Sequence, residues 1–398
     1  MRESFIREEM RIQVNKNLMW LFLLIAVAAC GKKDEKIADS LEDPFTWVFR
    51  SGTEGYACHR VVALVVTGEG TLLAFSEGRV LSCSDETDTD IVMKRSTDGG
   101  VSWSPLMVIE NDGPNPCKDP CPVVLPNGRI LLVYSWNESI PSEDDRTTRE
   151  VYLTYSDDDG LTWAESRNIT NMVYPGDRGW SGTGPGHGIV KERDPYRGRI
   201  VVAARHNPPG PGMSRGHLIC SDDNGETWFS GAIALRDRTS ESAVVELSDG
   251  SIMLNSRNGI DGQPYRVVSI SSDGGDSFDK TFLDIDLIEP NGCQGSILNH
   301  SFIQTTGKSN IIFSNPHHTV ERVNGTLKWS EDDGETWTKK FMYSNPYPAY
   351  SGYSDIAIIN GKDIAVLFEA GPSYIKGMRH EGVAFRIVTP GQFESIKK

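Results

Sequence analysis

Beyond residue 30, this chain contains no hydrophobic run long enough to cross a bilayer and no stretch with a helical period. Basic charge is also scarce, because 40 Lys and Arg residues stand against 55 Asp and Glu residues, which gives a net charge of −15. A surface that binds phosphates needs clustered cations, so this balance argues against nucleic acid as a partner. The 7 cysteines show no paired Cys-x-x-Cys spacings of the zinc-binding kind, and we expect neither a metal ion nor another cofactor.

One apolar run is present near the N-terminus, from Leu18 to Ala29, and it stops at Cys30. It is too short to span a bilayer and is typical of a secretion signal. The residues Val27-Ala28-Ala29-Cys30 resemble the lipobox of bacterial lipoproteins, in which the signal is cut before the cysteine and that cysteine receives lipid. Acyl chains would then hold the mature protein on a membrane. An ordinary signal peptide, cut elsewhere, is the alternative.

These features predict three segments: a lipoprotein signal peptide over residues 1–30, a flexible polar tether over 31–45 and one folded domain over 46–398. We expect the protein in a bacterial cell envelope, lipid-anchored at the outer membrane or cell surface. The six cysteines after Cys30 are an even number in an exported protein, so some could pair. Which of them pair is left open.

A short motif recurs five times, each copy with Ser, then Asp two residues later, then Gly, then Ser or Thr before an aromatic residue. The copies, called Asp-boxes below, begin at residues 96, 156, 221, 271 and 330, which are 60, 65, 50 and 59 positions apart. Steady self-similarity of this kind is typical of repeated structural units. In each box Gly allows a tight turn, Asp can bond the backbone amides of that turn, and the aromatic ring can pack on apolar surface. A calcium loop would need a different spacing of oxygen ligands, which no box has.

Short β-rich runs alternate with turn residues between the boxes, which predicts an all-β protein. The runs form six groups, and the sixth group, which begins at Tyr353, has no Asp-box. Groups of about four strands, with each box joining the third strand to the fourth, predict a six-bladed β-propeller. A β-helix or a sandwich is the alternative, although neither is expected to show units of this length.

Three arginines occupy similar positions at the ends of expected strands in blades one, four and five: Arg60, Arg257 and Arg322. Loops at one end of a propeller channel can bring distant residues together. Planar guanidinium groups bind carboxylates in a bidentate manner, so the three arginines predict a carboxylate clamp.

The order of several motifs along the chain resembles that of exo-α-sialidases (neuraminidases). The motifs are Arg60-Val61-Val62, Gly70-Thr-Leu-Leu-Ala-Phe-Ser-Glu-Gly-Arg79, Asp119-Pro-Cys-Pro122, Thr183-Gly-Pro-Gly-His-Gly188, Glu241-Ser-Ala-Val-Val-Glu-Leu247, Leu254-Asn-Ser-Arg-Asn258 and Tyr353-Ser-Asp355. The resemblance covers nearly everything after the tether. It implies a six-bladed propeller that removes terminal α-linked sialic acids from sialylated glycans.

The resemblance also implies roles for individual residues. Arg60, Arg257 and Arg322 would grip the sialic acid carboxylate, Glu369 would orient Arg60, and Arg79 would line the same pocket.

The remaining roles implied by the resemblance concern the reaction itself. Tyr353 would be the nucleophile, Glu241 the carboxylate that takes its proton, and Asp85 the acid/base. Asp88 and Asp90 compete for the last role, and we prefer Asp85 because it keeps the spacing of the resembled family before Lys94-Arg95-Ser96.

A tyrosine suits this chemistry because sialic acid carries a carboxylate at its anomeric carbon, which would repel a carboxylate nucleophile. Sialidases with Tyr are an exception among retaining glycosidases. Three alternatives are a sialoglycan-binding propeller without turnover, a trans-sialidase and a hydrolase for deaminated sialic acid. His187 is expected near the pocket rim.

Overall fold

The computed structural model describes residues 45–139, 149–174, 180–207, 214–290, 292–345, 349–372 and 380–396. The expected signal peptide, the lipobox Cys30 and residues 31–44 of the tether lie outside the described residues. Phe45, the last residue of the expected tether, is buried in the core with Phe368 and belongs to the folded unit that begins there. No helix in the described ranges is long and apolar enough to cross a membrane.

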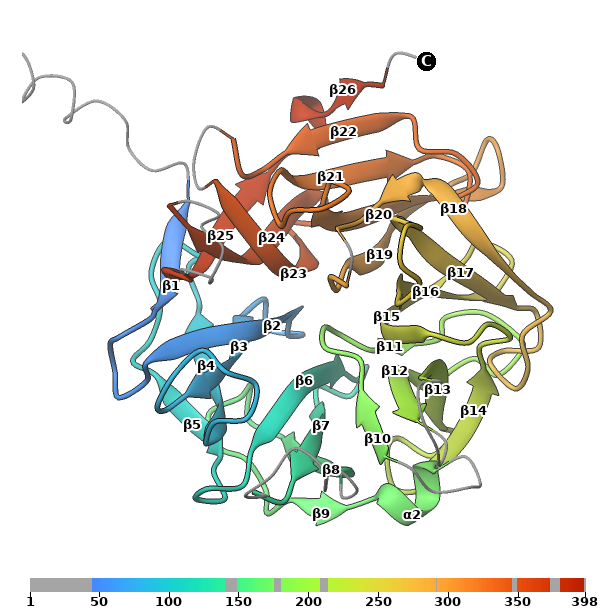
Figure 1. The fold of residues 1–398 in the computed structure, drawn as a ribbon. Helices are drawn as coiled ribbons and strands as arrows, with labels where there is room; N and C mark the ends of the chain where they lie inside the picture. Colours follow the sequence, from blue (N-terminus) through green and yellow to red (C-terminus); the bar gives the residue numbers. More distant parts are fainter. Residues whose placement is uncertain are drawn as a thin grey trace, which may run out of the picture. The chain divides into compact units, whose positions relative to one another are not determined.

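Six antiparallel sheets surround a central axis, each with one innermost strand (Figure 1). From the axis outward, the first sheet is β2 (Cys58–Val66), β3 (Leu72–Arg79), β4 (Thr89–Ser96) and β5 (Met107–Glu110). The second is β6 (Cys117–Val124), β7 (Ile130–Asn137), β8 (Arg149–Ser156) and β9 (Arg167–Asn168). The third is β10 (Trp180–Thr183) with β11 (Ile189–Val190), then β12 (Ile200–Asn207), β13 (Arg215–Ser221) and β14 (Phe229–Ile233).

The other three sheets continue around the axis. The fourth is β15 (Thr239–Glu246), β16 (Ile252–Asn258), β17 (Tyr265–Ser271) and β18 (Lys280–Ile288). The fifth is β19 (Ser296–Ile303), β20 (Lys308–Pro316), β21 (Gly325–Ser330), β22 (Lys339–Met342) and β26 (Glu394–Ser395). The sixth is β23 (Tyr350–Ile359), β24 (Asp363–Gly371), β25 (Gly382–Val388) and β1 (Thr46–Arg50). Two short helices complete the described elements, α2 (Thr170–Val173) and the 3-10 helix η2 (Pro390–Gln392).

The prediction of a six-bladed β-propeller is confirmed, and the blades follow the six groups of strands read from the sequence. The inner strand of the third blade is divided into β10 and β11, both paired with β12. The interruption contains Pro185, which has no N–H for a ladder, and Gly186, whose φ is +112°.

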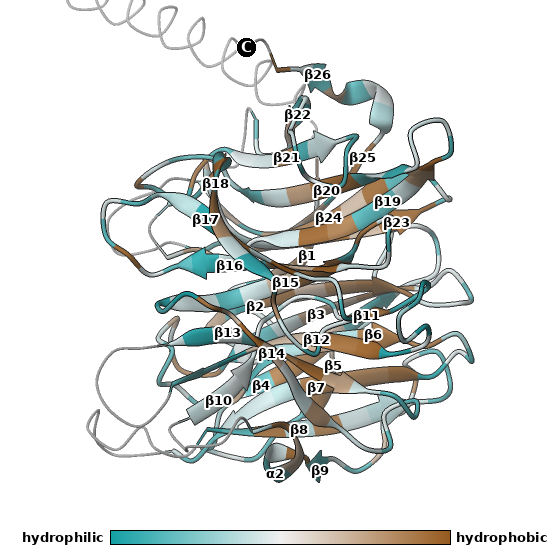
Figure 2. Cartoon of the chain, turned by 90° about the vertical axis from the view of Figure 1, so that its right-hand side faces the viewer, coloured by the Kyte–Doolittle hydropathy of each residue, from teal (hydrophilic) through white to brown (hydrophobic). Residues whose placement is uncertain are grey.

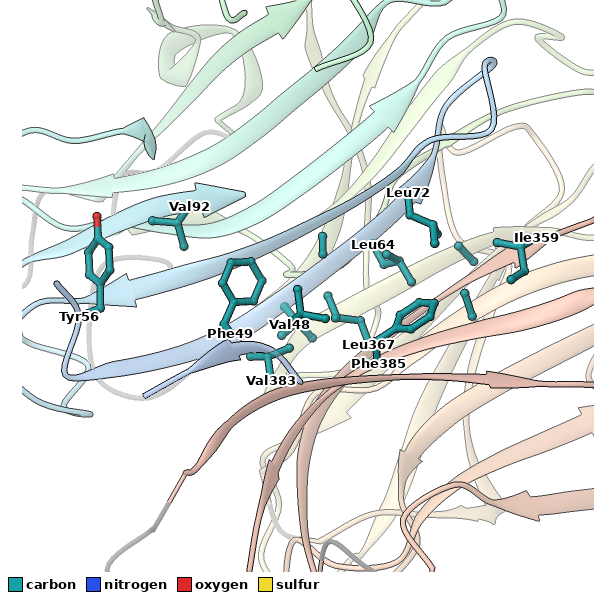
Figure 3. Packing of buried hydrophobic residues seen from close by; sticks show 14 residues of the cluster. Val48, Phe49, Tyr56, Leu64, Leu72, Val92, Ile359, Leu367, Val383 and Phe385 are labelled. Carbon is teal, nitrogen blue, oxygen red and sulfur yellow. The ribbon is translucent and has the colours of Figure 1, made fainter. Parts of the chain in front are cut away.

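The sixth blade is completed by a strand that the sequence analysis did not predict. Strand β1 pairs antiparallel with β25, so the N-terminal end of the folded unit closes the ring of blades. The seam between blades six and one is filled by apolar side chains from both blades, among them Phe49, Leu64, Leu367 and Phe385 (Figure 3). Figure 2 shows the same preference for apolar residues inside the blades, for example in β7 and β24. Radial closure of this kind leaves only short, protected sheet edges.

The Asp-boxes form turns between the third and fourth strands, as predicted. In the fifth box, Asp332 accepts hydrogen bonds from the Thr336 amide (2.8 Å), the Thr336 hydroxyl (2.6 Å) and the Ser330 hydroxyl (2.7 Å). The other four boxes repeat these bonds to the Ser or Thr four residues after the Asp. The aromatic residue of the fifth box, Trp337, is buried against the strands of its own and the neighbouring blade.

The cysteine pairing that the sequence left open is resolved for one pair. Cys58 and Cys83 form a disulfide. The other cysteines of the described ranges are free and buried: Cys117, Cys121, Cys220 and Cys293.

Replacing the Asp of a box should destabilise the fold. Asp332→Ala removes three hydrogen bonds to one half-buried carboxylate, and we expect the free energy of unfolding to fall by about 1–3 kcal/mol. Urea denaturation measures this change. The neighbouring Glu331→Ala is the control, because it removes an exposed ion pair with Lys339, for which a loss of about 0.2–1 kcal/mol is usual. Equal losses in the two variants would contradict a structural role for the box.

Candidate active site

A polar cavity of about 650 Å³ lies at one mouth of the propeller channel. Its lining includes Arg60, Asp119, Glu241 and Tyr353, which come from the first few residues of the innermost strands β2, β6, β15 and β23. Because the innermost strands of a propeller run in the same direction, their first residues meet at the same mouth. The cavity is within the usual size range of small-molecule sites.

The three arginines expected to form a carboxylate clamp surround one phenol ring. The guanidinium carbons of Arg60 and Arg322 lie 5.8 Å and 5.1 Å from the centre of the Tyr353 ring. Nη1 of Arg257 donates a hydrogen bond to the Tyr353 hydroxyl at 3.2 Å. Nη1 of Arg322 is buried and has no hydrogen-bond partner among the described residues. Buried donors are rarely left unpaired, so this group is suited to receive an anionic ligand.

Tyr353 and Glu241 form a close hydrogen-bonded pair in the cavity. The tyrosine hydroxyl lies 2.7 Å from both carboxylate oxygens of Glu241, and Arg257 lies 2.7 Å from Oε2. Burial, and then the charge of Glu241, raise the pKa of the Tyr353 phenol well above its usual range. Burial alone would raise the pKa of Glu241, but Arg257 and Arg205 together hold it far below its usual range. At neutral pH the pair is therefore a neutral phenol that donates to an ionised carboxylate.

Glu369 connects the arginine clamp to the tyrosine strand. Its carboxylate lies 3.4 Å from Nε of Arg60 and accepts backbone N–H bonds from Val61 (3.0 Å) and Tyr353 (3.2 Å) and an O–H bond from Tyr350 (3.1 Å). Val61 has φ of +55°, a strained conformation for a β-branched residue, and the bond to Glu369 stabilises it. Glu369 therefore orients Arg60 and also holds the backbone of Tyr353 in place.

Asp85 lies in the loop between β3 and β4 and reaches the cavity. Its Oδ1 atom is 2.7 Å from Nη1 of Arg79 and 3.6 Å from Nη1 of Arg60, while its side chain is 70% exposed. Partial burial would raise the pKa of Asp85, but the two guanidinium groups lower it overall. Of the two competing aspartates, Asp90 accepts hydrogen bonds from Tyr56 (2.6 Å) and Asn111 (2.7 Å), and neither Asp88 nor Asp90 lines the cavity.

All eight candidate residues of the propeller therefore meet in one place. Seven line the cavity, and Glu369 lies directly behind Arg60 and Tyr353. No cluster of three or more His, Cys, Asp or Glu side chains in the described ranges is arranged to hold a metal ion.

Comparison with known proteins places the chain in a family. Residues 70–366 match the BNR repeat-like domain family. The sialidase of Micromonospora viridifaciens is 32% identical over 81% of this chain, which spans 51% of that protein. The chain belongs to the sialidase family. The sialidase of Paraclostridium sordellii is also 32% identical, with 89% of this chain and 93% of that protein covered. Among solved structures, a Hadza microbial sialidase has a TM-score of 0.74 at 26% identity and covers 87% of this chain and 68% of its own.

Sequence reasoning gave no role to several charged residues of the cavity. Arg205 on β12 bridges two acids, with Nη2 at 2.9 Å from Asp119 and Nη1 at 3.0 Å from Glu241. Glu77 accepts hydrogen bonds from Arg79 at 2.7 Å and 3.0 Å and from the Asp119 amide at 3.1 Å. A signal was present, because Arg205 interrupts an apolar strand just as Arg60 does, and Asp119 and Glu77 lie within the family motifs.

The position expected for His187 is wrong. Its Nδ1 atom is 2.8 Å from Asp355, and the residue lines a separate cavity with Val66, Val124 and Val245. Those residues lie near the ends, not the starts, of the innermost strands, so His187 faces the opposite mouth of the channel. The Thr183–Gly188 motif connects β10 to β11, so its histidine lies toward the end of the innermost strand and away from the first mouth.

The acid sensitivity of the fold should depend on Glu369. Its burial would raise its pKa, but Arg60 and the other partners lower it from 4.5 to about 2. A depressed carboxyl pKa contributes stability above the unfolded value, and this contribution disappears as pH falls from 4.5 toward 2. The full contribution at neutral pH is about 3 kcal/mol.

Glu369→Gln should therefore lower stability at pH 7 and flatten the dependence of unfolding free energy on pH below 5. Denaturant melts at a series of pH values measure this slope. Glu69→Gln, in an exposed turn, is the control and should keep the wild-type slope. A Glu369→Gln slope as steep as wild type would show that the Glu369 charge does not stabilise the fold.

Proposed function

We propose that this protein is an exo-α-sialidase that hydrolyses terminal α-linked sialic acids with retention of anomeric configuration. The observation that carries the proposal is the buried Tyr353–Glu241 pair, with the hydroxyl 2.7 Å from the carboxylate in a cavity that holds three arginines. Membership of the sialidase family supports the same activity. The chain spans about half the length of the Micromonospora protein, so the activity is proposed for this propeller alone.

Substrate binding would use the carboxylate of the sugar. In the proposed complex this anion lies among Arg60, Arg257 and Arg322, where the unpartnered Nη1 of Arg322 gains an acceptor. Three clustered cations make the site selective for an anionic sugar, since a neutral hexose would leave part of their charge uncompensated. Binding through the anomeric carboxylate also places the anomeric carbon above the Tyr353 hydroxyl.

The phenol oxygen of Tyr353 would attack the anomeric carbon while its proton passes to Glu241. The leaving glycan oxygen takes a proton from Asp85, so the bond to the aglycone breaks as the bond to tyrosine forms. Water, deprotonated by Asp85, then displaces the tyrosine, and Glu241 returns the proton to it. Two inversions give net retention.

Asp85 is ionised in the empty cavity because two guanidinium groups lower its pKa. To act as an acid it must be protonated when a glycan binds. A sugar that excludes water from the exposed side chain, and whose carboxylate neutralises Arg60, would raise its pKa in the complex. Glu241 and Tyr353 already have the protonation states that the first step requires. A binding module would not require this pair, which argues against a propeller without turnover.

We also propose that a lipid on Cys30 anchors the protein to the membrane of a bacterial cell envelope. The lipobox sequence and the adjacent apolar run support this proposal.

The first test is release of a fluorogenic aglycone from an aryl α-sialoside. Wild type should release it, and Tyr353→Phe should lower kcat/KM by about a thousandfold or more, because the nucleophilic oxygen is lost. Tyr343→Phe is the control, since Tyr343 is also buried but bonds Ser314 outside the cavity. Proton NMR of the first product should show the α-anomer of the free sugar. No release by wild type, or unchanged release by Tyr353→Phe, would overturn the mechanism.

The second test separates acid catalysis from nucleophilic attack. Asp85→Ala should slow hydrolysis of a natural sialyl-oligosaccharide by about 10²- to 10⁴-fold, the usual contribution of a general acid. With an aryl leaving group that needs no proton, the loss in the first step should be much smaller. Parallel kcat/KM measurements with the two substrates test this. Asp88→Ala is the control and should affect neither substrate, and equal losses on both substrates in Asp85→Ala would exclude Asp85 as the acid.

A further inference from the structure

The Cys58–Cys83 disulfide lies directly beside the proposed active site. Cys58 is the first residue of β2 and is two positions before Arg60. Cys83 is in the loop between β3 and β4 and is two positions before Asp85. The crosslink therefore joins the strand that carries a clamp arginine to the loop that carries the proposed acid.

The strand ladder already holds the hairpin on which this disulfide sits. Cys58 is the register partner of Arg79, the last residue of β3. Hydrogen bonds from Ala57 to Val80 (3.3 Å) and from Val80 to Asp88 (3.0 Å) then close the base of the loop. The segment that the disulfide newly constrains is consequently short, from Val80 to Cys83.

The loop tip beyond Val80 has few other constraints from the rest of the fold. Leu81 is 78% exposed, and the tip amides bond side chains of the loop itself: Leu81 bonds the Thr87 hydroxyl at 3.3 Å, and Ser84 bonds the Ser82 hydroxyl at 3.2 Å. Three cationic side chains reach the tip from the cavity. Arg79 lies 2.7 Å from the Asp85 carboxylate and donates to the Cys83 carbonyl at 2.6 Å, Arg60 lies 3.6 Å from the Asp85 carboxylate, and Lys118 donates to the Asp85 carbonyl. These contacts orient the tip only while it stays close to β3, which is what the disulfide ensures.

We propose that the Cys58–Cys83 disulfide is a positioning element for Asp85, resting on the function proposed above. It fixes the height of the Asp85 carboxylate over the cavity relative to Arg60, so that the carboxyl proton lies within hydrogen-bond reach of the leaving oxygen. Proton transfer is sensitive to such placement, and a shift of about 1 Å can cost a hundredfold in rate. The crosslink acts through Asp85 and touches no reacting atom itself.

A positioning role has a kinetic signature that a purely structural role lacks. Loss of the disulfide should slow the hydrolysis of substrates that need a protonated leaving group, and spare substrates that do not. A general loss of folded protein would lower both rates by the same factor. The ratio of the two kcat/KM values therefore reports on Asp85 and is independent of the amount of active enzyme.

The experiment compares wild type with the double variant Cys58→Ser/Cys83→Ser, using a natural sialyl-oligosaccharide and an aryl α-sialoside. We expect about a tenfold or larger loss on the natural substrate and about a threefold or smaller loss on the aryl substrate. Treatment of wild type with dithiothreitol should reproduce this pattern and leave the double variant unchanged. In an Asp85→Ala background, dithiothreitol should not alter the substrate ratio.

Equal losses on both substrates, or an unchanged ratio after reduction, would overturn the inference while the proposed function stands. Amide hydrogen exchange gives a second readout that needs no activity. Reduction should speed exchange in residues 81–86 and leave the β2–β3 ladder protected, and unchanged exchange in the tip would also contradict the proposal. If wild type cleaves neither sialoside, the proposed function fails, and exchange still shows whether the disulfide holds the tip.

Discussion

The compensation of buried guanidinium groups by buried carboxylates is the interaction on which this site depends. Burial of a charge is costly unless a partner and hydrogen bonds compensate it. Glu369 stabilises Arg60 and the backbone of Tyr353, and Glu241 lies between Arg257 and Arg205. Nη1 of Arg322, one of the clamp arginines, has no hydrogen-bond partner among the described residues. The network thus holds the cations in place and leaves a hydrogen-bond donor of Arg322 available to an anionic ligand.

The closed ring of blades makes this network possible. Polar side chains from blades one, two, four and six converge because the first few residues of their innermost strands share one mouth. The apolar seam between blades six and one, with β1 paired to β25, keeps the ring closed (Figure 3). A rigid ring is needed because Glu369 and Arg60 come from the two blades that meet at this seam. Separation of those blades would break the ion pair beside the tyrosine.

Local sequence patterns predicted most of the fold and much of the site. The Asp-boxes indicated the blades because each box makes its bonds within one turn, so its effect can be read from a few residues. Strand β1 was missed because its pairing with β25 spans nearly the whole folded chain. The split between β10 and β11 follows from Pro185 and Gly186, whose effect on the ladder was not recognised. The disulfide partners could not be chosen because six cysteines allow 15 pairings.

The sequence by itself determined the number of blades and the residue types available for the chemistry, since these depend on short motifs and their spacing. Only the tertiary structure decided that Arg205 joins Asp119 to Glu241, that His187 faces the far mouth, and that Cys83 is tied to Cys58. The physical reason is that such contacts depend on the direction in which a side chain leaves its strand and on how the blades close. Neither property is local to the residues concerned.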